Sequence, residues 1–133
     1  MINVDIRSDS RYPVDRKRIR NTVIETLEKE NLDNVDVSVF VVGKRKMHDL
    51  NKSYRGLDYP TNVLSFCQYD QGLDDKGDFV QGGDEDVQFY LGDIVVCFPV
   101  AVEQSRESWL MVDDWIDTLV EHSVQHLLGR HHR

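Results

Sequence analysis

The sequence predicts a single α+β domain over residues 1–133, in which a small mixed sheet of about four strands packs against helices. Three observations predict it. Four segments have the alternating or continuously apolar pattern of strands, and the segments around them repeat apolar side chains at helical spacing. No internal repeat or linker divides the chain. Its 133 residues, of which 40% are hydrophobic and 30% charged, are enough to bury a core without disulfide bonds.

The first half of the chain predicts two strands that are each followed by a helix. Ile2, Val4 and Ile6 alternate with polar residues, which is typical of a half-buried strand. The next segment has apolar side chains at helical spacing after Pro13, a residue that the first turn of a helix accepts. The predicted elements are a strand over 2–7, a helix over 13–30, a strand over 35–42 and a helix over 44–55.

The second half predicts two more strands and two consecutive helices. Pro60 excludes a helix immediately before it, because the residue that precedes a proline is disfavoured in the α region. Gly92 predicts a bulge or a close approach of another backbone within its strand, and Gly129 is a natural helix stop. The predicted elements are strands over 61–68 and 89–98, a helix over 100–108, and a helix capped by Asp113 or Asp114 that runs to Leu128.

The net charge is a poor guide to the partners of this chain. A formal charge of −8 argues against a polyanionic partner. However, residues 70–86, which predict a solvated and mobile loop, hold seven acids and one lysine, a net of −6 that leaves −2 elsewhere. Basic residues cluster at 16–20 and 44–55. The distribution of charge therefore does not exclude a nucleic acid.

Compositional features predict a protein of a reducing compartment. No apolar run approaches the roughly 20 residues of a membrane span, and the N-terminal segment lacks the pattern of a secretory signal. Cys67 and Cys97 lie in apolar, strand-like segments, which favours two buried, reduced thiols, with a single disulfide as the alternative. We expect a cytoplasmic protein, or one of an organellar matrix if its source is eukaryotic, without a membrane partner.

The clearest chemical signal is a group of histidines near the C-terminus. His122 and His126 are four residues apart on the predicted last helix, so they share one face, with Cβ atoms about 5–6 Å apart. Beyond the stop at Gly129 the chain can turn back and bring His132 to the same face. Three neutral nitrogen ligands with an open fourth position suit a catalytic zinc ion, which lowers the pKa of its bound water towards about 7. A frayed polar tail is the alternative, but the apolar residues between these histidines predict a docked helix.

A metallopeptidase is a weaker interpretation of the same histidines. The H-E-x-x-H motif of such enzymes places a glutamate, the general base, directly after the first histidine. Ser123 occupies that position here, and Glu121 lies about 100° away around the helix, on the wrong side of His122. The peptidase interpretation therefore lacks its base.

Three segments form an ordered set of motifs. HSVQHLLGRHH (residues 122–132) is similar to H-G-x-L-H-L-x-G-Y-D-H, and LNKSYRGLDYPTNVLSF (residues 50–66) is similar to L-N-x-x-Y-R-x-x-D-x-P-T-D-V-L-S-F. LGDIVVC (residues 91–97) is similar to L-G-D-I-x-I-S. Together they resemble the signatures of the YbeY family, the bacterial and organellar endoribonucleases of rRNA maturation. The departures from these signatures are Asn62, Ser123, Gln125, Arg130 and His131.

The resemblance implies one zinc ion per chain, held by His122, His126 and His132, with His131 as a competing nitrogen beside the third ligand. It places the family's signature arginine on Arg55. It also implies a zinc-dependent hydrolase of single-stranded RNA, in particular rRNA, that acts in rRNA maturation and ribosome quality control. The ribosome or its proteins would be partners, and no DNA is expected. In this scheme a metal-bound water attacks the phosphodiester, and Arg55 stabilises the charge on the phosphate through two donors.

Other interpretations stay open at this point. The chain could be a non-catalytic RNA-binding or ribosome-assembly factor whose metal is structural. Arg55 could form a structural salt bridge with Asp58 or Asp93, and either carboxylate could orient a ligand histidine. For three aromatic residues we expect core packing rather than stacking on RNA bases: Tyr54, Tyr59 and Phe66.

Overall fold

Four strands form one mixed sheet in the computed structural model, which describes residues 1–68 and 87–129. The strands are β1 (Ile2–Ser8), β2 (Val35–Val42), β3 (Val63–Cys67) and β4 (Phe89–Cys97). They lie in the order β1–β2–β4–β3, with β1, β2 and β4 parallel and β3 antiparallel to β4 at one edge. The loop predicted over 70–86 lies outside the described residues.

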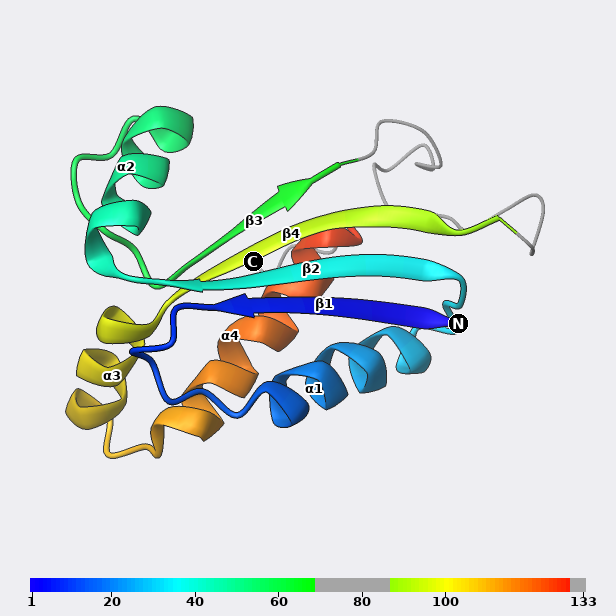
Figure 1. Cartoon of the computed structure of the whole chain (residues 1–133), viewed down its shortest axis with the longest axis horizontal. Coiled ribbons are helices and arrows are strands. Elements are labelled where there is room, and N and C mark those ends of the chain that lie inside the picture. Colours follow the sequence, from blue (N-terminus) through cyan, green and yellow to red (C-terminus); the bar gives the residue numbers. More distant parts are fainter. Residues whose placement is uncertain (69–86, 130–133) are drawn as a thin grey trace.

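The helices cover the two faces of this sheet unequally. They are α1 (Arg16–Lys29), α2 (Lys44–Arg55), α3 (Phe98–Glu107) and α4 (Val112–Leu127). α1 and α4 pack side by side on one face, over the main core, whereas α2 lies on the other face at one end (Figure 1). A smaller cluster beneath α2 contains Met47, Leu64, Val95 and Cys97. The predicted single α+β domain is thus confirmed. No helix in the described part of the chain is long and apolar enough to cross a membrane.

Helices α1 and α3 begin at residues other than the predicted ones. The bounds of α2 and β2 agree with the prediction, but α1 begins at Arg16 because Asp15 caps it. The Asp15 carboxylate accepts a hydrogen bond from the Arg18 N–H at 3.0 Å. α3 begins at Phe98, predicted as the last residue of a strand, so that Pro99 lies in the first turn, where its missing N–H costs nothing.

The predicted cap of the last helix is wrong. α4 begins at Val112, with Met111 as its N-cap residue and no hydrogen bond from a capping side chain. Asp113 and Asp114 lie in the first turn instead, where their negative charge interacts favourably with the helix dipole. Asp114 also binds Arg18 of α1, a partner that the local sequence does not reveal.

Two predictions of burial are also wrong. Cys97 is buried, which raises the pKa of its thiol, but Cys67 ends the edge strand β3 and is exposed. Neither cysteine forms a disulfide with another described residue. Tyr54 and Tyr59, predicted to pack in the core, are 68% and 52% exposed, and only Phe66 is partly buried.

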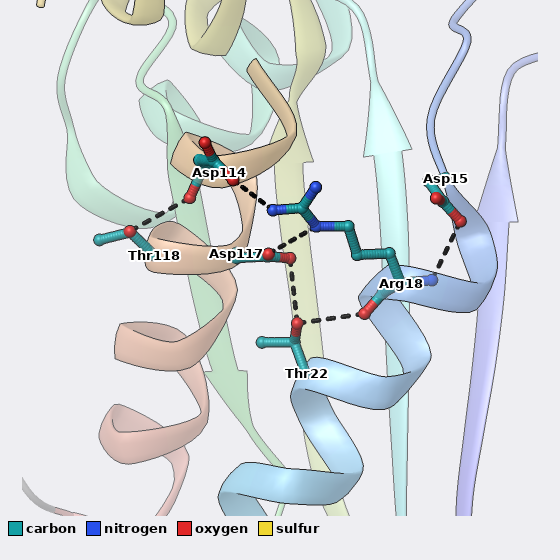
Figure 2. Close-up of polar contacts among 6 residues, drawn as sticks. All are labelled: Asp15, Arg18, Thr22, Asp114, Asp117 and Thr118. Atoms are coloured by element: carbon teal, nitrogen blue, oxygen red, sulfur yellow. Dashed lines mark hydrogen bonds and ion pairs between the residues drawn. The ribbon is translucent and has the colours of Figure 1, made fainter. Parts of the chain in front are cut away.

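A polar cluster joins α1 to α4 (Figure 2). Arg18 Nε donates to Asp117 Oδ2 at 2.7 Å, and its Nη2 donates to Asp114. Thr22 Oγ1 donates to the other oxygen of Asp117 at 3.0 Å. The cluster adds directional contacts to an interface that is mainly aliphatic, and these contacts help to fix how α4 lies beside α1.

Gly92 lets α4 approach the sheet closely. Its φ of +154° is a conformation that side-chain-bearing residues rarely adopt, and the pairing of β2 with β4 shifts register between Asp36 and Val37 beside it. A Cβ atom at this position would lie 2.2 Å from Phe66 O and 2.9 Å from Leu127 Cδ2. The bulge and the close approach predicted at Gly92 are both present.

We predict that Gly92→Ala lowers the free energy of unfolding by about 2–4 kcal/mol, because it adds a backbone clash to an unfavourable φ. Gly56→Ala is the matched control, since Gly56 has a φ of +69° but a Cβ atom there would meet no atom within 4 Å. It should cost only about 1 kcal/mol, the penalty of the left-handed conformation. Chemical denaturation measures both variants, and equal losses would contradict the close approach at Gly92.

Arg18→Met should lower the Tm, by an amount that shrinks as salt is added, because the ion pairs it removes are partly exposed and screened. Methionine keeps a similar length and helix propensity. Arg20→Met is the control, since Arg20 is exposed on the same helix and pairs with no carboxylate among the described residues. Thermal unfolding at low and high salt measures the Tm of both variants. An equal decrease in Tm for Arg18→Met and Arg20→Met would contradict this role of Arg18.

Candidate functional site

A cavity of about 620 Å³ lies between α4, β3 and the end of α2. It brings Arg55 together with two of the three predicted metal ligands, His122 and His126. The third predicted ligand, His132, and its neighbour His131 lie outside the described residues. The lining residues are Arg55, Asn62, Val63, Leu64, Ser65, Trp115, Leu119, His122, Ser123 and His126.

The two faces of α4 explain why these histidines reach the cavity. Trp115, Leu119, His122 and His126 recur at helical spacing and form one stripe along the cavity wall. The adjoining face is buried in the main core, and this packing sets the rotation of the helix. Its buried aliphatic residues are Ile116, Val120, Val124 and Leu127. Both histidine residues are accessible on the cavity side.

Arg55 is the last residue of α2, and the local fold holds its backbone. Gly56 has the left-handed conformation typical of a helix end, and its N–H donates to Lys52 O at 3.1 Å. The segment that follows is tied back to the helix by buried Asn51, whose Nδ2 donates to Tyr59 O at 2.7 Å. An exposed arginine is therefore carried by ordered backbone at the cavity wall.

The structural salt bridges considered for Arg55 are not formed. Asp58 bonds to His48 Nε2 at 2.7 Å instead, and this contact lowers the pKa of the carboxyl group. Asp93 accepts a hydrogen bond from Gln68 Nε2 at 3.2 Å. Neither carboxylate lines the cavity. Within the described part of the chain Arg55 has no ion pair, so its guanidinium is available to a ligand.

The polar lining of the cavity suits an anion. No carboxylate of residues 1–68 and 87–129 contributes to it, although the whole chain carries a formal charge of −8. The polar side chains are one guanidinium, two imidazoles, an amide and two hydroxyls, together with the indole of Trp115. Arg55 supplies hydrogen-bond donors and a positive charge, and none of these groups presents a negative charge to repel a phosphate.

Gln104 of α3 orders this wall, a role that none of the sequence motifs predicts. Gln104 Oε1 accepts hydrogen bonds from Asn62 Nδ2 at 3.1 Å and from Trp115 Nε1 at 3.0 Å. These bonds tie the segment before β3 to α3 and α4. The only sequence signal was the asparagine at position 62, where the YbeY motif has an aspartate, because an amide can donate this bond and an ionised carboxylate cannot.

The donor chemistry of the cavity fits a zinc ion. Two imidazoles one helical turn apart can supply two nitrogen ligands. The described residues contain no group of three or more His, Cys, Asp or Glu side chains that could hold a metal. A complete three-histidine site would need a residue after Gly129, as the predicted His132 is.

Known proteins resemble this chain over almost its whole length. A family model described as "Endoribonuclease YbeY" matches residues 4–133. The endoribonuclease YbeY of Thermoanaerobacter sp. (strain X514) is 36% identical over 135 residues, which cover 98% of this chain and 84% of that protein. The Brevibacillus brevis protein of the same name is 34% identical over 137 residues, covering 99% and 85% of the two chains.

A solved structure agrees with the fold. The solution structure of TM1509 from Thermotoga maritima matches with a TM-score of 0.56 and 26% identity, covering 98% of this chain and 75% of that one. All three matches, to the family model, to the relatives and to this structure, include the segments that form the cavity. The chain therefore belongs to the YbeY endoribonuclease family.

Proposed function

We propose that this protein is a zinc-dependent endoribonuclease that cleaves single-stranded RNA, with rRNA as its substrate and the ribosome as its partner. The observation that carries the proposal is the cavity in which Arg55 lies together with His122 and His126. None of the described residues contributes a carboxylate to this cavity. Family membership supplies the reaction class, the cleavage of RNA phosphodiester bonds.

Zinc would be held by His122, His126 and His132, and when bound it supplies a water that is activated for attack at neutral pH. Hydrolysis of a phosphodiester also requires stabilisation of the negative charge that grows on the non-bridging oxygens. The planar guanidinium of Arg55 can bind two of these oxygens at once. Because Arg55 has no ion pair among the described residues, it does not have to break one to bind the phosphate.

Ser65 can add a second donor. It lies within β3 and lines the cavity, as do Leu64 and Asn62 before it. The bonds of Gln104 to Asn62 and Trp115 order this wall before substrate arrives. Ordered donors cost little reorganisation when charge develops, and this increases their contribution to the rate.

Peptide hydrolysis is disfavoured by Ser123. This residue, at the position of the glutamate in H-E-x-x-H, is 3% exposed and donates to Leu119 O of its own helix at 2.9 Å. No carboxylate in the described part of the cavity replaces the missing base. The remaining alternative is an RNA-binding assembly factor with a structural metal, which would bind RNA without cleaving it.

His122→Ala and His126→Ala should each abolish stoichiometric zinc, since each removes a ligand from a site expected to hold about one ion per chain. His48→Ala is the control, because His48 bonds to Asp58 away from the cavity. The neighbours His131 and His132 form a second matched pair, of which only His132→Ala should weaken binding. Mass spectrometry of the metal content measures all variants. Unchanged zinc in His122→Ala would rule out this site.

Arg55→Ala should lower kcat for single-stranded RNA by about 10²–10³-fold, the usual effect of removing one donor to a developing anion. Zinc content and Tm should not change, because Arg55 is exposed and has no ion pair among the described residues. Arg20→Ala removes an exposed arginine that does not line the cavity and should leave kcat unaltered. Normal cleavage by Arg55→Ala would contradict the role assigned to Arg55, and no cleavage by the wild type would favour the assembly factor.

A further inference from the structure

A second concave surface lies on the sheet face that α1 and α4 leave uncovered. It is a groove of about 290 Å³ between α2 and the strands β2, β4 and β3, near the lower limit of small-ligand sites, which run from roughly 300 Å³ upward. Its lining is mainly apolar, with Phe40 and Phe66 from the sheet and Tyr54 from α2. Lys46 provides a positive charge at its wall, and the carboxylate of Asp93, which also lines it, accepts hydrogen bonds from Gln68 and Tyr90. The volume suits one planar ring system rather than a peptide segment.

Tyr54 gives this groove an accessible aromatic wall. Its side chain is 68% exposed, and its ring lies 4.9 Å from that of Phe66, at an interplanar angle of 64°. The contact with Phe66 supports the tyrosine ring on one side, and much of the residue stays open to a ligand. An exposed ring of this kind can stack on a nucleobase, whatever the identity of the base.

Residues that line the groove are adjacent in sequence to residues that line the proposed cleavage site. Tyr54 lines the groove, and the next residue, Arg55, lines the cavity. Likewise, Phe66 lines the groove, and the preceding residue, Ser65, lines the cavity. Neighbouring residues of a strand point to opposite faces, so Ser65 and Phe66 place the two spaces on opposite sides of the edge strand β3. An RNA that passes over this edge strand can engage both.

Charge on the far side of the groove also suits RNA. Phe40, Val42 and Lys46 line both the groove and an adjoining cavity of about 790 Å³. That cavity has five basic residues and two acidic ones along its wall. Arg7, Arg11 and Lys44 pair with carboxylates, whereas Arg45 and Lys46 have no ion pair among the described residues. A basic surface that continues from an aromatic groove is the arrangement by which proteins bind single-stranded nucleic acids, with phosphates on the cations and bases on the rings.

We propose that the groove between α2 and the open face of the sheet binds a nucleobase of the RNA substrate, stacked on Tyr54, next to the phosphate held by Arg55. This inference rests on the proposed function, because the occupant is part of the same substrate. It accounts for a preference for single strands, since a base within a duplex is already stacked and cannot enter the groove. Tyr54 is in this view a binding residue, and Arg55 acts on the phosphate.

The test measures the affinity of the full chain for a fluorescein-labelled, phosphorothioate-stabilised single-stranded RNA by anisotropy. Tyr54→Ala should weaken binding by about 5- to 100-fold, the range for loss of one base stacked on an aromatic ring. Tyr54→Phe keeps the ring and should bind like the wild type. Tyr59→Ala is the matched control, because Tyr59 is also exposed, at 52%, and lines neither the groove nor the cavity.

Two further probes separate base stacking from a general loss of affinity. An oligomer of abasic residues and an RNA duplex should each bind equally to wild type and Tyr54→Ala, because neither offers a free base. Unchanged affinity of Tyr54→Ala for single-stranded RNA would overturn the proposal, as would an equal loss for all three probes. Wild-type cleavage is assayed separately on unmodified RNA, so that a protein that binds through Tyr54 without cleaving would refute the proposed function alone.

Discussion

The packing of α4 on the sheet is the constraint on which the rest of the structure depends. Leu127 lies so close to Gly92 that a Cβ atom there would come within 2.9 Å of its Cδ2. The residue before Leu127 is His126, so the depth at which this helix packs decides where the imidazole lies. The aliphatic face sets the rotation of the helix, and the contacts of Arg18 set its position beside α1. The cavity is a consequence of this docking.

The distribution of carboxylates explains how an acidic chain can have a site for an anion. The chain carries −8, but the described acidic side chains bind elsewhere or lie away from the cavity. Two of them hold Arg18, one bonds to His48, and Asp93 lies on the other face of the sheet with Tyr90 and Gln68. Arg55 is left without a carboxylate partner among these residues, which is what a phosphate-binding arginine requires.

Much of this fold could be predicted from the sequence, because the spacing of apolar residues indicates which face of a helix or strand is buried. β2, α2 and the special role of Gly92 agree with the prediction. The site residues Arg55, His122 and His126 were selected from motifs, and they line one cavity. Prediction failed where the deciding partner is remote in sequence: Gln104 orders the wall from another helix, and Arg18 binds an aspartate expected to be a cap. Tyr54 was expected in the core but is exposed, because the helical pattern of residues 44–55 does not show whether another element covers the apolar face of that helix.

The most direct test of the central claim is X-ray diffraction at the zinc absorption edge from crystals of the protein with a phosphorothioate-stabilised single-stranded RNA. An anomalous peak should lie against the imidazoles of His122 and His126, with an RNA phosphate between the metal and the guanidinium of Arg55. A peak that contacts neither histidine, or a phosphate bound away from Arg55, would contradict the account.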